Sequence, residues 1–164
     1  MDKFGNARVA FRFHEIVQPW HFQSTIVHEA ACVVRAVHPE SPDKQVAVWA
    51  SLFSKQEEFF DVNVGEEGRD KIHARLSVVL EEFVPKETYL AMVAYDPQKI
   101  KEGSKNPGCA MTQQIKDLTR YSRRVGVHVS PTVYLNGEEQ TKVSSGWTME
   151  QWEAFVKEKQ KADM

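Results

Sequence analysis

The most informative part of the sequence is GVHVSPTVYLNG, residues 126–137. Pro131 has no N–H to donate to a β-ladder, so it suits the first position of a strand, and a proline there tolerates a cis Ser130–Pro131 bond. Thr132 to Leu135 form an apolar strand, and Asn136-Gly137 is typical of the type I′ turn of a hairpin. The stretch therefore predicts strands at 127–135 and 140–144, joined by a tight turn.

The rest of the chain is mainly helical in its hydrophobic pattern. Period-two alternation in residues 7–17, ARVAFRFHEIV, predicts one more strand, with one polar face. The 3.6-residue pattern predicts helices at 21–37, 43–60, 69–83, 86–94 and 110–124, and glycine and proline predict a loop at 98–108. Gly126 should end the long helix, and Thr148 with Gln151 has the spacing of a capping box that starts the last one.

These features together resemble the thioredoxin-like superfamily, and within it the DsbA-like proteins. Residues 126–137 are similar to the cis-proline signature of the superfamily, and the helical block is similar to the insertion of DsbA-like proteins. Two more stretches carry the resemblance. The first runs from FRF at residues 11–13 through Pro19-x-His21 to EAA at residues 29–31. The second is the pattern Trp49-x-x-Leu52-Phe53-x-x-Gln56. The resemblance implies an α/β, thioredoxin-like (DsbA-like) fold.

We expect a single domain over residues 1–164, with the helical insertion at about residues 39–107. The resemblance also implies a Cys-x-x-Cys pair at the start of the first core helix, where the helix dipole lowers the pKa of the first thiol. This chain has only Cys32 and Cys109, which cannot form such a pair. Two alignments with the family remain open, and neither supplies a redox pair.

In the first alignment, residues 7–17 are the second core strand, so the first strand and its helix would lie before Met1. In the second, residues 7–17 are the first core strand, and QPWH at residues 18–21 occupies the position of the two cysteines. In the family, the first core strand lies between the second core strand and the cis-proline strand. The first alignment lacks that strand, so the backbone groups of its two neighbours would be left unpaired. We then expect either direct pairing of residues 9–16 with the hairpin or a homodimer that covers the edge.

The resemblance favours a redox-inactive module that binds a peptide or another protein. Ser130, Pro131 and Thr132 would make the main-chain contacts, with Trp20 and His21 opposite them. The alternative is an N-terminally truncated or degenerate thiol–disulfide oxidoreductase. A third hypothesis uses Cys109, just ahead of a helix, as a lone reactive thiol in a glutathione-dependent activity.

Composition argues against other classes of function. The formal net charge is −2 and no basic stripe is present, which argues against a nucleic-acid partner. No apolar run has the length of a membrane span, and the first residues lack the apolar core of a secretory signal, so we expect no membrane association and a cytoplasmic protein. His21 and His28 lie two helical turns apart, about 10 Å along the axis. That spacing is too long for both rings to bind one metal ion, so we expect no metal site. We also expect no other cofactor.

Overall fold

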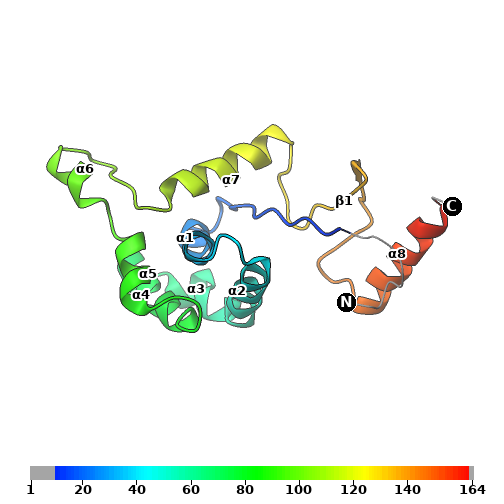
Figure 1. The fold of residues 1–164 in the computed structure, drawn as a ribbon, viewed down its shortest axis with the longest axis horizontal. Helices are drawn as coiled ribbons and strands as arrows, with labels where there is room; N and C mark the ends of the chain where they lie inside the picture. The colour runs from blue at the N-terminus through cyan, green and yellow to red at the C-terminus, as the bar shows by residue number, and fades with distance from the viewer. Residues whose placement is uncertain (1–9, 163–164) are drawn as a thin grey trace. The chain divides into compact units, whose positions relative to one another are not determined.

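A computed structural model describes residues 10–162 of the chain (Figure 1). Helices account for 55% of the structure and strands for 3%, in one two-stranded sheet. The predicted α/β, thioredoxin-like (DsbA-like) fold is therefore wrong: the described residues contain a hairpin but no central sheet on which helices could be layered. Of the strand expected at 7–17, residues 7–9 lie outside the described residues and residues 10–17 form no strand.

The physical reason is that, within residues 10–162, no strand lies in a ladder with residues 10–17. Alternating side chains favour a strand only when a neighbouring strand satisfies its backbone and one face is buried. Here Phe11 and Phe13 are both exposed, and their rings stack on one another with centroids 6.3 Å apart. A local aromatic contact has replaced the cross-strand contacts that the alternation predicted.

The described residues form two compact units. Residues 15–125 make the helical unit, and residues before 15 and after 125 make the other, here called the hairpin unit. The helical unit contains α1 (Ser24–Val37), α2 (Pro42–Ser54), η2 (Gln56–Phe59), α3 (Asp61–Val64), α4 (Arg69–Val79), α5 (Lys86–Val93), α6 (Pro97–Lys101) and α7 (Thr112–Arg124). The hairpin unit contains β1 (Tyr134–Leu135), β2 (Glu138–Glu139) and α8 (Met149–Ala162).

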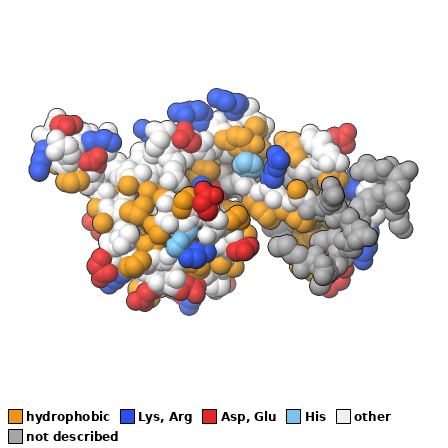
Figure 2. Space-filling model, in the orientation of Figure 1, with side chains coloured by type: hydrophobic (Ala, Val, Ile, Leu, Met, Phe, Trp, Pro, Cys, Tyr) orange, Lys and Arg blue, Asp and Glu red, His pale blue; other side chains and the backbone are white. Residues whose placement is uncertain are grey.

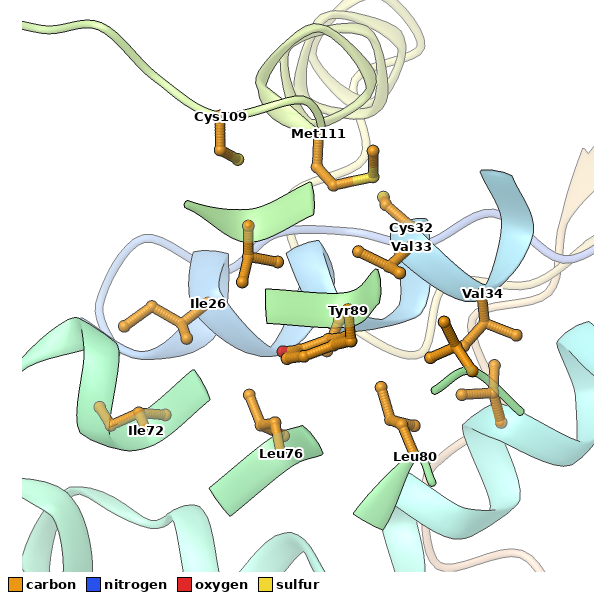
Figure 3. Packing of buried hydrophobic residues seen from close by; sticks show 14 of the residues in the cluster. Ile26, Cys32, Val33, Val34, Ile72, Leu76, Leu80, Tyr89, Cys109 and Met111 are labelled. Atoms are coloured by element: carbon orange, nitrogen blue, oxygen red, sulfur yellow. The ribbon is translucent and has the colours of Figure 1, made fainter. Parts of the chain in front are cut away.

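Helix α1 is the centre of the helical unit, and α2, α4, α5 and α7 all pack against it. Ala30 and Ala31 let neighbouring helices come close, while Val33 and Val34 fill the space between them. Figure 3 shows side chains of α1, α4 and α5, among them Leu76, converging on this core. The helices within residues 39–107 therefore share one core with α1.

The helix expected at 43–60 is divided into two elements, α2 and η2. Helix α2 stops at Ser54, whose hydroxyl donates to the carbonyl of Ser51, and η2 and α3 follow. The turn places Phe59 in the core. Val46 and Phe53, two apolar residues within the helix expected at 43–60, are exposed. Other boundaries were accurate: α4 begins at Arg69 and α5 at Lys86, as predicted.

In the hairpin unit, the predicted turn is confirmed, but the predicted strands are too long. Asn136 (φ 50°) and Gly137 (φ 90°) form the predicted turn with positive φ at both positions, and Tyr134 pairs with Glu139. The Ser130–Pro131 bond is cis, as predicted. The ladder covers only two residues on each strand, however, so the strands predicted at 127–135 and 140–144 were too long.

The start of α8 confirms the predicted capping box. The Thr148 N–H donates to Oε1 of Gln151 at 2.8 Å, and the Gln151 N–H donates to Oγ1 of Thr148 at 3.4 Å. Trp147 packs edge-to-face with Trp152 and Phe155, which anchors the helix to the segment before it. None of the helices in the described part of the chain combines the length and the apolar character needed to cross a bilayer.

Candidate functional site

The residues predicted from the sequence to bind a peptide fall in different units. Ser130 and Pro131 are exposed in the hairpin unit, and Thr132 beside them donates from Oγ1 to the carbonyl of Val129 at 2.7 Å. Trp20 and His21 are exposed in the helical unit. Their arrangement on opposite sides of one peptide site therefore stays a prediction, and each half is described by itself.

Two segments of the helical unit that are hydrogen-bonded to one another carry exposed apolar side chains. These side chains are large and have high exposed fractions: Trp20 58%, Phe22 52%, Phe60 47% and Val62 90%. We call this group the aromatic surface. Figure 2 shows hydrophobic side chains reaching the surface of the helical unit among acidic and basic ones. Large exposed apolar side chains on two neighbouring segments make this part of the helical unit a candidate interaction surface.

Two hydrogen bonds hold the segments of the aromatic surface together. Nδ1 of His21 donates to Oδ2 of Asp61 at 3.0 Å, which joins the segment of Trp20 to α3. Nε2 of Gln23 donates to the carbonyl of Phe59 at 2.7 Å, and Gln23 is buried. The hydrogen bond from His21 lowers the pKa of Asp61, with a smaller contribution from Gln23.

The segment before α1 is also held at its other end. Glu15 accepts a hydrogen bond from Nε1 of Trp49 at 2.5 Å and forms an ion pair with Arg35. The chain from Glu15 to Gln23, which turns before α1, is thus attached to α1 and α2 at one end and to η2 at the other. Trp20 is therefore carried by a short segment with both ends fixed.

A second group, missed from the sequence, lies inside the helical unit and is here called the Glu29 cluster. Oε2 of Glu29 accepts from Arg69 at 2.8 Å and from Nε2 of His73 at 3.1 Å. Oε1 accepts from Sγ of Cys109 at 3.3 Å. Nδ1 of His73 lies 2.8 Å from the hydroxyl of Tyr89. The cluster joins α1, α4, α5 and the segment before α7.

The network assigns the protons of the cluster. Glu29 and His73 have exposed fractions of only 7% and 1%. Because Nε2 of His73 faces a carboxylate, this nitrogen carries a hydrogen and donates it to Glu29, while Nδ1 is paired with the Tyr89 hydroxyl. Arg69 supplies the charge opposite Glu29. Every polar group is thus paired, as burial requires.

Burial and the hydrogen-bonding partners of Glu29 shift the pKa of its carboxyl in opposite directions, and the net shift is downward. Burial by itself raises the pKa of the carboxyl, but the hydrogen bond from His73, the charge of Arg69 and the hydrogen bond from Cys109 together bring it below the ordinary value. The same carboxylate acts in the opposite direction on Cys109. Burial first, and then the charge of Glu29, raise the pKa of that thiol. The cluster therefore holds Cys109 as a protonated donor.

Cys32, the other cysteine, is also unsuited to thiol chemistry. It lies fully buried in α1, and burial is the main cause that raises its pKa to about 12. Both cysteines are free in the structure. Within residues 10–162, no group of three or more His, Cys, Asp or Glu side chains has the geometry of a metal site. The chemistry that these groups support is structural hydrogen bonding.

Sequence reasoning missed this cluster although a signal for it was present. Glu29 occupies the same stripe of α1 as Ile26 and Val33, and His73 lies between Ile72 and Leu76 on α4. An ionisable residue on the apolar stripe of a helix must find partners in the core. The pattern could have named Glu29 and His73 but not their pairing, since these residues are far apart in the chain.

Comparison of the chain with protein-family models, with curated proteins and with solved structures finds no match. The thioredoxin-like, DsbA-like resemblance is therefore without support from a relative. The function has to be argued from the aromatic surface, the Glu29 cluster and the two cysteines.

We predict that Glu29→Gln lowers the unfolding free energy at pH 7 by about 3 kcal/mol, because it leaves Arg69 and His73 without their charged acceptor. A carboxyl whose pKa is lowered on folding contributes stability above its unfolded pKa, near 4.5, and loses that contribution as the pH falls through its folded pKa. The difference in unfolding free energy between the wild type and the variant, measured by urea unfolding, should therefore become smaller below about pH 4.5. Glu40→Gln, at an exposed position, is the control and should change little at either pH. An equal loss at all pH values would contradict the assigned charge of Glu29.

Proposed function

We propose that this chain is a redox-inactive binding module that holds a peptide segment of a partner protein on the aromatic surface. The observation that carries the proposal is the exposure of Trp20, Phe22, Phe60 and Val62 on segments that are already fixed. A preformed surface loses little conformational entropy when a partner binds. Exposed tryptophan is also among the residues that contribute most to binding energy at interfaces.

The state of the cysteines supports the redox-inactive part of the proposal. Thiol–disulfide exchange begins with an accessible thiolate. Cys32 and Cys109 are buried and the pKa of each thiol is raised, so thiolate is scarce near neutral pH. The same argument weakens both the oxidoreductase alternative and a role for Cys109 as a lone nucleophile. Two free cysteines also favour a reducing compartment such as the cytoplasm.

The first prediction from this proposal concerns thiol reactivity. Both thiols should react with a disulfide reagent much more slowly in the folded protein than in urea, because burial limits access and thiolate formation. Colorimetric titration with an aromatic disulfide measures both rates on one sample. Rapid reaction of one equivalent in the native protein, abolished by Cys109→Ser, would contradict redox inactivity and support the lone-thiol hypothesis.

The second prediction concerns binding itself. A phage-displayed library of short random peptides, selected on the wild-type chain, should yield peptides that lose about tenfold or more in affinity for a Trp20→Ala, Phe60→Ser variant, as removal of a hot spot implies. Ile100→Ser is the matched control, because it removes an exposed apolar side chain on α6, away from the aromatic surface (Figure 1). Failure to enrich any peptide that separates wild type from the double variant would overturn the proposed function.

A further inference from the structure

We infer that the partner segment bound by the aromatic surface is cationic, with lysine or arginine interspersed among apolar residues. The inference rests on the proposed function and specifies its ligand. Its basis is the charge of the chain segment that supplies half of the aromatic surface, together with the ion pairs that this segment already makes.

The segment from η2 to the start of α4 is strongly acidic. Residues 56–70, QEEFFDVNVGEEGRD, contain six carboxylates and one cationic side chain. Phe60 and Val62 lie in the middle of this segment, on either side of Asp61. The apolar side chains of the surface are thus surrounded in the chain by acidic ones, although the whole protein has a net charge of only −2.

Part of this negative charge is already neutralised by neighbouring cations. Glu58 pairs with Lys55 at 3.1 Å, and Glu67 pairs with Lys71 at 3.2 Å and with Arg75 at 3.0 Å. These carboxylates are therefore poor candidates for contacts with a partner.

Two other carboxylates of the acidic segment keep their charge available. Glu57 and Glu66 are exposed and form no ion pair with any residue that the structure describes. Glu57 lies three residues before Phe60 in the chain, and Glu66 lies four residues after Val62. Asp61, between them, contacts His21 and is half exposed. The unneutralised charge therefore flanks Phe60 and Val62 on both sides.

Aromatic rings next to carboxylates suit lysine and arginine for two reasons. The ring face attracts a cation, while the carboxylate supplies an opposite charge, and the aliphatic stem of the side chain packs on the apolar surface. Trp20 and Phe22 provide the rings on one segment, and Glu57 and Glu66 provide the charge on the other. An acidic partner would bring its carboxylates close to Glu57 and Glu66. The repulsion between these like charges costs free energy and disfavours acidic partners.

The test uses three labelled synthetic peptides that differ only in charge: repeats of Lys-Trp-Lys-Leu, of Ser-Trp-Ser-Leu and of Glu-Trp-Glu-Leu. Fluorescence anisotropy with the full chain should rank their affinities in that order. The lysine peptide should bind about tenfold or more tightly than the serine peptide, and its binding should weaken as salt is added, because exposed charge pairs are screened.

Glu57→Gln and Glu66→Gln should each lower the affinity for the lysine peptide by about two- to fivefold, the range of exposed ion pairs. Glu40→Gln, which removes an exposed charge beyond the far end of α1, should leave its affinity unchanged.

The outcomes separate this inference from the proposal on which it rests. Equal affinity for the three peptides, with loss of binding in the Trp20→Ala, Phe60→Ser variant, would overturn the cationic preference and leave the proposed function standing. Binding of the lysine peptide that the same variant retains in full would show attraction to net charge alone and would overturn the inference. Absence of binding by all three peptides and by the selected library would overturn both.

Discussion

Glu29 places an ionised carboxylate inside the helical core, and a charge in that position has to be paired and hydrogen-bonded because removal from water costs several kcal/mol. Arg69 and His73 reach it from α4, and Cys109 reaches it from the segment before α7. These contacts are directional, whereas the apolar contacts around them are not. The cluster therefore fixes how α4 and the segment before α7 are set against α1, and the apolar side chains fill the space that this arrangement leaves.

The aromatic surface depends on the same arrangement. Helix α1 carries Glu29 near its middle, and the segment with Trp20 and Gln23 leads directly into its first turn. Helix α4 follows α3, so the position of Arg69 also limits where Phe60 can lie. The hydrogen bonds from His21 and Gln23 then join the two segments locally. The buried Glu29 cluster and the exposed aromatic surface are thus connected through α1.

Local sequence signals predicted local structure well. The turn at Asn136-Gly137, the capping box at Thr148 and the starts of α4 and α5 each depend on a few adjacent residues, and each was found where the sequence placed it. The fold class failed because a sheet depends on pairing between distant segments. Alternation in residues 7–17 gives the faces of a strand but not the neighbour that it needs. The break of α2 at Ser54 was missed for a similar reason, since burial of Phe59 is decided by tertiary packing.

The candidate site was predictable in part. Trp20 and His21 were named from the sequence and are exposed as a binding role requires, but Phe60 and Val62 join them only through contacts across about forty residues of chain. Glu29 and His73 could have been suspected from their place on apolar stripes. Their common interaction with Arg69 and Cys109 follows only from the three-dimensional packing.

A double-mutant cycle between Glu29 and Arg69 tests the organising role of the buried carboxylate most directly. Urea unfolding of the wild type, Glu29→Gln, Arg69→Met and the double variant gives the interaction free energy of the pair. The two residues contact one another, so the account predicts a coupling of about 1–3 kcal/mol at pH 7, with the double variant more stable than the sum of the single losses implies. Single losses that add within about 0.5 kcal/mol would contradict it, because residues that add in this way are not interacting.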